Sequence, residues 1–249
     1  MVKALLGQLA LAGAAMSAIV VATSTVEPVY VGRAPVVERL VGETWRDTTA
    51  ARAPWAVAHA EVAMRMPQFE ADRQAFAADL RGTGRIGAAR ADSIALVAVR
   101  EAYVQKVPPA LVFGVLLTEN ATFRSSARSN VGAVGLMQIY PKYWVPTLGR
   151  KFGRDLRDDE TNLRYGVHIL AHYVYTSVNR VAEPTPDAVL SKGLLRYNGC
   201  VKGTNTKGCH RYPDKVLDNV ERYAKAQCGV GVAECVAKPI QVAMETRGR

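Results

Sequence analysis

The sequence lacks the motifs that usually accompany a strongly basic protein. Its 249 residues include 32 Lys and Arg against 22 Asp and Glu, which gives a net charge of +10 and a sequence pI near 9.6. The cations are spread along the chain, and no zinc finger, aromatic-basic RNA motif or helix-turn-helix signature occurs. Gly82 and Gly84 are too sparse for a phosphate loop. We therefore expect no nucleic acid as a partner, although scattered positive charge attracts other polyanions.

Cysteine is absent from the first 199 residues and then occurs four times, at Cys200, Cys209, Cys228 and Cys235. An even number of cysteines in an exported chain indicates two disulfides. Three pairings exist, and we expect the two local ones, 200 with 209 and 228 with 235, because each closes a short loop that contains glycine. The alternative is a zinc site with His210, but no spacing is Cys-x-x-Cys. His168 and His172 lie one helical turn apart without an evident third ligand, so we expect neither a metal nor a cofactor.

Long apolar runs are also absent, with one exception at the N-terminus. The stretch from Ala4 to Ala22 follows Lys3 and contains few polar residues. This pattern predicts a secretory signal over residues 1–22, with the mature chain starting near Thr23. The run is nearly long enough to span a bilayer, so an uncleaved membrane anchor is the alternative.

Strand signals are few, and helical periodicity is common. Helices are expected at 56–64, 88–107, 110–118, 160–179, 186–197 and 213–226. We therefore predict a mainly α fold with at most a small sheet. Residues 23–85 would form a helical extension of unknown role that ends in a linker at 81–85. Residues 86–236 would form the main domain, and residues 237–249 a loose basic tail.

Glu119 is the main candidate for chemistry. It ends an apolar helix that can begin at Pro108-Pro109, because the first turn needs no internal N–H partners. Three apolar residues share a helix face with Glu119, at seven, four and three positions before it: Val112, Val115 and Leu116. They would shield the carboxyl group from water. Desolvation would raise the pKa of this carboxyl, so that it could hold a proton and donate it. The alternative is a solvent-facing Glu at a helix end.

Three sequence blocks follow Glu119 in a recognisable order. The first runs through Phe123 and Ser129 to Gly-Ala-Val-Gly-Leu-Met-Gln-Ile at 132–139, followed by a proline. Asn162-Leu163 with Gly166 is the second block, and Tyr197-Asn198-Gly199 is the third. The segment from 95 to 227 thereby resembles the catalytic core of the soluble lytic transglycosylases, lysozyme-like enzymes that cleave bacterial peptidoglycan.

This resemblance implies an α+β lysozyme-like fold and a single general acid/base, Glu119. Hydrolytic glycosidases generally need a second carboxylate, but none occurs between Glu119 and Asp155, and the acidic run 155–160 is expected to cap a helix. A lytic transglycosylase needs none, because the C6 hydroxyl of the muramic acid attacks C1. The MurNAc-GlcNAc β-1,4 bond would be cut with formation of a 1,6-anhydro end. A lysozyme-type hydrolase and a non-catalytic peptidoglycan-binding module are the alternatives.

Substrate-binding positions also follow from the resemblance, namely Ser129, Gly135, Met137, Gln138, Tyr140, Tyr197 and Asn198. Among them, Tyr197 would orient Glu119, Asn198 would pin a turn, and Met137 could equally pack in the core. The chain departs from the commonest family pattern at Asn120, which follows the acid directly, and at Arg196 before Tyr197.

The implied partners and location complete these expectations. The partner would be peptidoglycan glycan strands, with envelope or secretion machinery as a further possibility, and the protein would be a monomer. It would be periplasmic or in the cell envelope, anchored to the inner membrane if the leader is retained.

Overall fold

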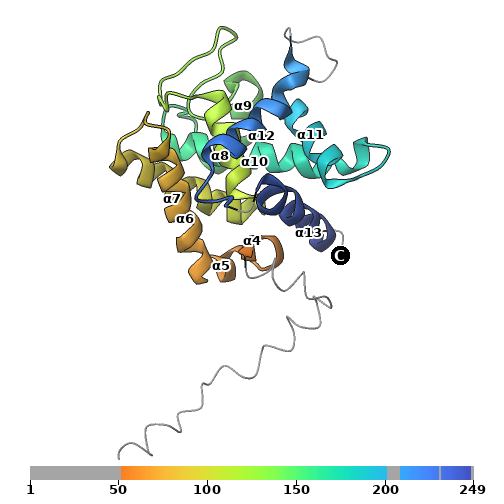
Figure 1. The fold of residues 1–249 in the computed structure, drawn as a ribbon. Helices are drawn as coiled ribbons and strands as arrows, with labels where there is room; N and C mark the ends of the chain where they lie inside the picture. Colours follow the sequence, from red (N-terminus) through yellow and green to blue (C-terminus); the bar gives the residue numbers. More distant parts are fainter. Residues whose placement is uncertain (1–51, 201–207, 230, 248–249) are drawn as a thin grey trace, which may run out of the picture. The chain divides into compact units, whose positions relative to one another are not determined.

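The computed structural model describes residues 52–200, 208–229 and 231–247, and it is helical throughout most of these ranges (Figure 1). The predicted leader and the start of the extension lie outside them. The elements are α4 (Pro54–Val57), α5 (Ala60–Ala63), α6 (Pro67–Gly82), α7 (Ala88–Gln105), α8 (Pro109–Glu119), α9 (Pro141–Phe152), α10 (Asp159–Thr176), η1 (Val178–Arg180), α11 (Pro186–Tyr197), η2 (Cys209–Arg211), α12 (Tyr212–Tyr223), η3 (Ala233–Ala237) and α13 (Lys238–Arg247).

The described residues form no β-strand. Isolated bridges pair Val134 with Arg128 and with Ile139. The predicted mainly α fold with at most a small sheet is therefore confirmed. Within these ranges, no helix is both long enough and apolar enough to cross a membrane.

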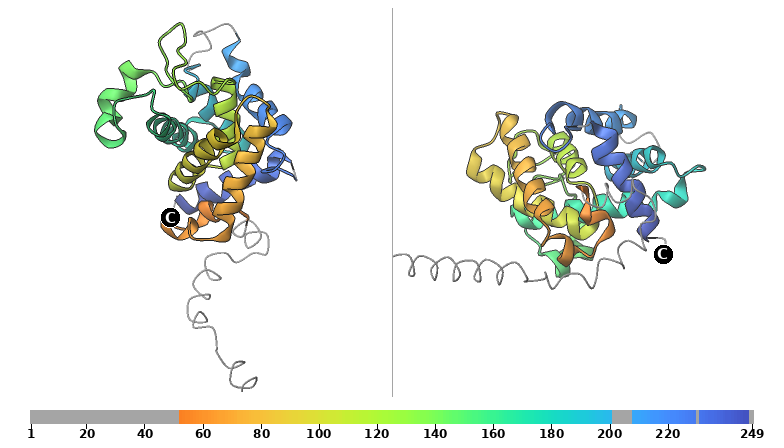
Figure 2. Two further views of the ribbon diagram at one scale, coloured as in Figure 1. Left: turned by 90° about the vertical axis from the view of Figure 1, so that its left-hand side faces the viewer. Right: turned by 60° about the horizontal axis from the view of Figure 1, so that its bottom comes forward.

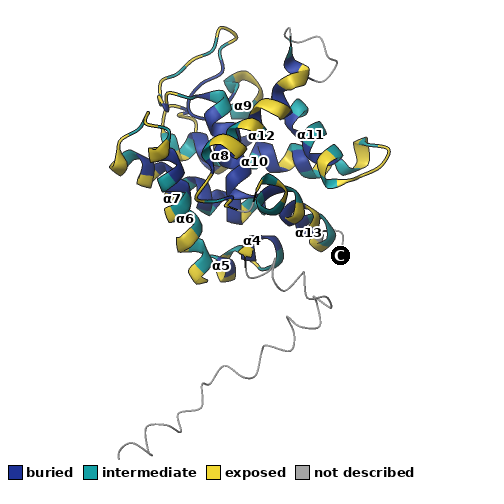
Figure 3. Ribbon diagram, viewed as in Figure 1, coloured by how far each residue is buried: buried dark blue, intermediate teal, exposed yellow. Residues whose placement is uncertain are grey.

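Helix α8 lies in the middle of the other helices (Figures 1 and 2). Every residue from Pro109 to Leu117 is buried, as expected for a helix that is hydrophobic on all sides. It contacts α6, α7 and α12, and Phe113 packs edge-to-face on Phe76 with ring centroids 5.5 Å apart. Figure 3 shows the same arrangement as a buried centre inside helices with exposed outer faces. The rigid core therefore fixes the position at which α8 ends, which is Glu119.

Gly114 allows α12 to lie directly against α8. A Cβ atom at this position would lie 2.5 Å from the Cγ2 atom of Val220 and 2.8 Å from the backbone oxygen of Val216. These distances leave no room for a side chain. The close approach brings the start of α12, including Tyr212, to the end of α8.

The described parts of the N-terminal extension (52–85) and of the C-terminal tail (237–247) belong to the same core as the main domain. Trp55 is 2% exposed, and α6, which ends at Gly82, packs along α7. Residues 81–85 therefore connect two packed helices of one unit and are not a linker between two. The expectation of a loose tail is wrong for residues 238–247, which form α13. Ile240 and Ala243 of α13 are fully buried, and the Thr246 hydroxyl donates to the backbone oxygen of Ala56.

Both predicted disulfides are present. Cys200 pairs with Cys209, and Cys228 pairs with Cys235. The four thiols are thereby used, which removes the zinc alternative built on them. The Nδ1 atom of His168 faces the amide oxygen of Gln105 at 3.2 Å.

Candidate active site

Glu119 is the last residue of α8, and Asn120 shapes the chain immediately after it. Asn120 is 5% exposed, and its amide nitrogen donates to the backbone oxygens of Arg124 (2.8 Å) and Gly135 (3.2 Å). Its amide oxygen accepts from the Thr122 hydroxyl at 3.1 Å. The departure from the commonest family pattern therefore has a structural role, because Asn120 ties the turn after the acid to the glycine-rich segment.

The Glu119 carboxyl group is held by one hydrogen bond. Its Oε1 atom accepts from the Tyr212 hydroxyl at 2.6 Å. Within the described ranges, no residue bonds to Oε2, and no cation pairs with this carboxyl. One oxygen is therefore fixed, and the other is free to carry a proton.

Burial raises the pKa of Glu119 to about 7, and the hydrogen bond from Tyr212 opposes this shift. Burial acts because the charged form loses hydration that the neutral acid hardly needs. The carboxyl also lies at the C-terminal end of α8, where the helix dipole disfavours negative charge. Near neutral pH the site therefore contains both the acid and its conjugate base in comparable amounts.

Tyr197 does not contact Glu119 in the way that the sequence predicted. Its hydroxyl donates to the backbone oxygen of Met137 at 2.9 Å. Burial, and to a smaller extent the negative charge of Glu119, raise the Tyr197 pKa well above its usual value. The effect of that charge indicates that the Tyr197 ring lies close to Glu119. Tyr212 makes the contact with Glu119 that was predicted for Tyr197. The sequence did not indicate this role for Tyr212.

The glycine-rich segment is clamped by Asn162, which is 1% exposed. Its amide nitrogen donates to the backbone oxygens of Val134 (2.9 Å) and Leu156 (2.8 Å), and its amide oxygen accepts from the N–H of Met137 at 2.7 Å. Gly135 has φ +83°, and a Cβ atom there would lie 2.1 Å from the Asn162 amide nitrogen. The second motif block thus holds the first in place.

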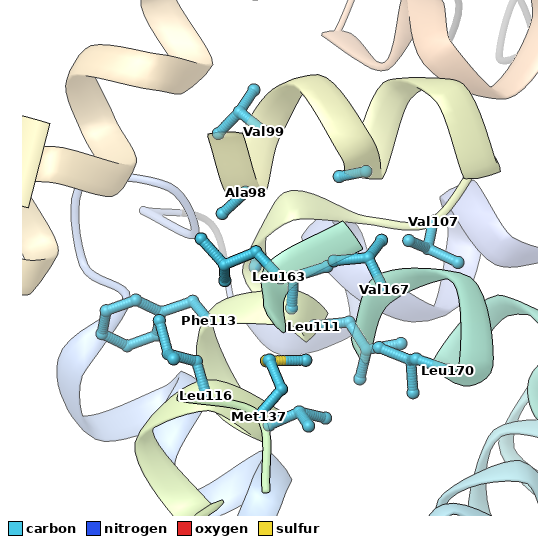
Figure 4. Close-up of a cluster of buried hydrophobic side chains, with 14 of the residues drawn as sticks. Ala98, Val99, Val107, Leu111, Phe113, Leu116, Met137, Leu163, Val167 and Leu170 are labelled. Carbon is cyan, nitrogen blue, oxygen red and sulfur yellow. The ribbon is translucent and has the colours of Figure 1, made fainter. Parts of the chain in front are cut away.

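The two side chains after Leu136 have different surroundings. Met137 is fully buried in the hydrophobic cluster drawn in Figure 4, beside α8 and α10. It therefore packs in the core, which was the alternative left open by the sequence. Gln138 is partly exposed, and its amide nitrogen donates to the backbone oxygen of Gly135 at 2.8 Å. Its amide oxygen has no partner in the described part of the chain.

The other predicted substrate-binding residues lie on turns. The Ser129 hydroxyl accepts from the N–H of Ala133 at 3.0 Å, which closes the turn before the glycine-rich segment. Tyr140 is partly exposed, and its ring centroid lies 6.0 Å from that of the exposed Tyr143. Asn198 ends α11 and is exposed, in agreement with the predicted turn.

Comparison with known families gives one result for this region. Residues 98–194 match the model of the transglycosylase SLT domain. The match includes Glu119, the glycine-rich segment and Asn162, whereas Tyr197, Tyr212 and both disulfides lie beyond it. No curated protein matches the chain.

Proposed function

We propose that the protein is a peptidoglycan lytic transglycosylase, because residues 98–194 match the transglycosylase SLT domain, a domain of enzymes that act on peptidoglycan. It cleaves the MurNAc-GlcNAc β-1,4 bond and leaves a 1,6-anhydromuramic acid end. The observation that carries this proposal is the state of Glu119, a partly buried and desolvated acid with a pKa of about 7, whose Oε2 atom has no hydrogen-bond partner among the described residues.

In the first step, protonated Glu119 donates its proton from Oε2 to the glycosidic oxygen. The bond from that oxygen to C1 of the muramic acid breaks, and the GlcNAc side departs as an alcohol. The resulting carboxylate keeps the hydrogen bond from Tyr212 to Oε1. That bond stabilises the negative charge, because hydrogen bonds to charged acceptors are the stronger ones.

In the second step, the same carboxylate accepts the proton of the muramic acid C6 hydroxyl. The C6 oxygen attacks C1 and closes the 1,6-anhydro ring, and Glu119 returns to its protonated form. Donor and acceptor are then one group, so its pKa has to lie near the working pH. A value of about 7 meets this requirement.

The environment of Glu119 supports this route over hydrolysis. Hydrolysis generally uses a second carboxylate as nucleophile or base. The Glu119 pKa is raised by burial, and no neighbouring acid contributes to the shift. The substrate's own hydroxyl group can supply the nucleophile, which no described residue supplies at this point.

Substrate contacts are proposed for the polar groups on the surface of the turn segment. The free amide oxygen of Gln138 can accept from a sugar hydroxyl or acetamido N–H, and Ser129 can donate its hydroxyl proton. The partly exposed Tyr140 ring can stack on a sugar face. Two disulfides support an oxidising compartment, so we place the enzyme in the periplasm or cell envelope.

Mass spectrometry of the fragments released from purified peptidoglycan tests the proposed reaction. The wild type should produce muropeptides with 1,6-anhydro ends, and Glu119→Gln should release none above background. Fragments with only reducing ends would identify a hydrolase and reject the proposed chemistry. An intact Glu119→Gln fold, checked by circular dichroism, separates loss of chemistry from loss of structure.

A further inference from the structure

A groove of about 380 Å³ borders the helix end that carries Glu119. Thr118 and Ala121, which flank the acid in sequence, form one wall, and Arg85 from the α6–α7 turn forms another. The third wall is the outer face of α12, with Lys215 and Arg222. Because α12 also supplies Tyr212 to Glu119, the same helix contributes to the acid's surroundings and to the groove.

The groove carries an excess of unpaired positive charge. Arg85, Lys215 and Arg222 are exposed, and within the described part of the chain none of them forms an ion pair. Asp218 is the one acid in the lining. Some other arginines are paired, as in Arg81 with Asp92 at 2.8 Å. Such unpaired cations gathered in a concave surface favour binding of an anion.

The floor of the groove adds neutral hydrogen-bonding groups. The Asn219 amide nitrogen donates to the Thr118 hydroxyl at 2.9 Å, and that hydroxyl donates to the backbone oxygen of Gly114 at 2.7 Å. The amide oxygen of Asn219 has no partner among the residues that the structure describes. It can therefore accept an N–H group, such as that of a peptide bond.

We infer that this groove binds the stem peptide of the glycan substrate, with Lys215, Arg222 and Arg85 facing its carboxylates and Asn219 accepting a peptide N–H. The inference rests on the proposed function, which supplies a substrate that carries peptides with free carboxylates. The glycan backbone offers hydroxyl and acetamido groups, so the cations match the peptide part. Lys215 and Arg222 are accordingly residues that determine specificity, and they take no part in bond cleavage.

The test compares two double variants on two substrates. Lys215→Gln/Arg222→Gln removes two charges from the groove, and Arg65→Gln/Arg180→Gln removes two exposed, unpaired charges elsewhere. The substrates are intact peptidoglycan and glycan strands from which an amidase has removed the stem peptides. The lactyl carboxylates that this hydrolysis frees are converted to neutral amides, so that the strands carry no new anions. The groove variant should raise KM on intact peptidoglycan about fivefold to tenfold with kcat unchanged. Uniform binding energy acts on KM in this way.

The remaining outcomes are decisive for the stem-peptide site. Neither variant should change cleavage of the stripped strands, and the control variant should match the wild type on both substrates. Equal effects of the two double variants, or an equal loss on both substrates, would overturn the inference. If anhydro products form and the groove variant behaves as wild type, the proposed function stands and the peptide site fails.

A binding measurement covers the case in which the wild type cleaves neither substrate. Calorimetric titration with a soluble muropeptide and with the same disaccharide lacking its peptide reads out recognition without turnover. Weaker muropeptide binding by the groove variant alone supports the peptide site, and equal affinities for all three proteins reject it.

Discussion

Glu119 and Asp79 are both desolvated carboxyl groups, but the protein satisfies them very differently. Burial raises the pKa of each. Asp79 in α6 accepts from the backbone N–H groups of Ala226 (2.8 Å) and Gln227 (3.1 Å) and from the Gln227 amide at 3.0 Å. Glu119 accepts one hydrogen bond, on one oxygen. A raised pKa therefore does not identify a catalytic acid by itself. A partly buried acid with one oxygen that no described residue bonds leaves room for substrate.

The contrast also reflects position in the fold. Asp79 joins α6 to the segment after α12, and it thereby attaches the N-terminal extension to the C-terminal part of the chain. Glu119 lies at the end of the central helix beside a charged groove. The first acid connects two elements, and the second is available to a ligand.

Catalytic activity should separate the two acids most strongly. Glu119→Gln should lower the rate of peptidoglycan solubilisation by a factor of about 10² to 10⁴, the usual contribution of a general acid. Asp79→Asn should leave the rate unchanged at temperatures where the protein stays folded. Dye release from labelled peptidoglycan measures both, and a comparable loss in Asp79→Asn would remove the distinction.

The second difference concerns stability and its dependence on pH. Folding raises the Glu119 pKa from 4.5 to about 7, so the native state binds the proton more tightly than the unfolded state. Ionisation of Glu119 is therefore unfavourable to folding above the folded pKa, and this penalty is absent below the unfolded pKa. Glu119→Gln should stabilise the protein by up to about 3 kcal/mol at pH 8 and have little effect at pH 4. Urea unfolding at both pH values checks this, and a destabilised variant at pH 8 would contradict it.

Asp79→Ala should change stability in the opposite direction. Its removal leaves the N–H groups of Ala226 and Gln227 without their acceptor. A hydrogen bond to a charged acceptor contributes about 1.5–3 kcal/mol. Urea unfolding at pH 8 should show a lower midpoint for Asp79→Ala and a higher one for Glu119→Gln. Two shifts of the same sign would mean that both acids are structural.

Tyr212→Phe should lower the rate much less than Glu119→Gln. Its hydroxyl lowers the Glu119 pKa, so its loss should move that pKa upwards. The first step needs the protonated acid, and the high-pH limb of the pH-rate profile should therefore shift to higher pH. The maximal rate should fall about fivefold, as expected for one hydrogen bond of about 1 kcal/mol. Tyr197→Phe is the matched control, because the Tyr197 hydroxyl bonds to the backbone oxygen of Met137. Its loss should not shift the high-pH limb of the pH-rate profile.

The sequence predicted the parts of the site that depend on local patterns. The apolar helix ending at Glu119, the positive φ of Gly135 and the two short-range disulfides all follow from neighbouring residues. The clamp by Asn162 was present in the sequence as a motif block, although its contacts become visible only in three dimensions.

The parts that the sequence did not predict depend on contacts between distant residues. Tyr212 lies 93 positions after Glu119, and a tyrosine that begins a helix has no distinguishing signature. The polar composition of the tail suggested a loose end, but Ile240, Val242 and Ala243 of α13 pack into the core. Packing partners for α13, such as Ala56 in α4, come from the other end of the described chain.

Direct titration of the Glu119 carboxyl tests the central claim. Carbon-13 NMR of protein labelled at the glutamate side-chain carboxyl, with Glu119→Gln to assign the resonance, gives its pKa without turnover. We predict a titration midpoint of about 7. A midpoint at or below the ordinary glutamate value of 4.5 would contradict the assignment of Glu119 as the acid that donates and then recovers the proton.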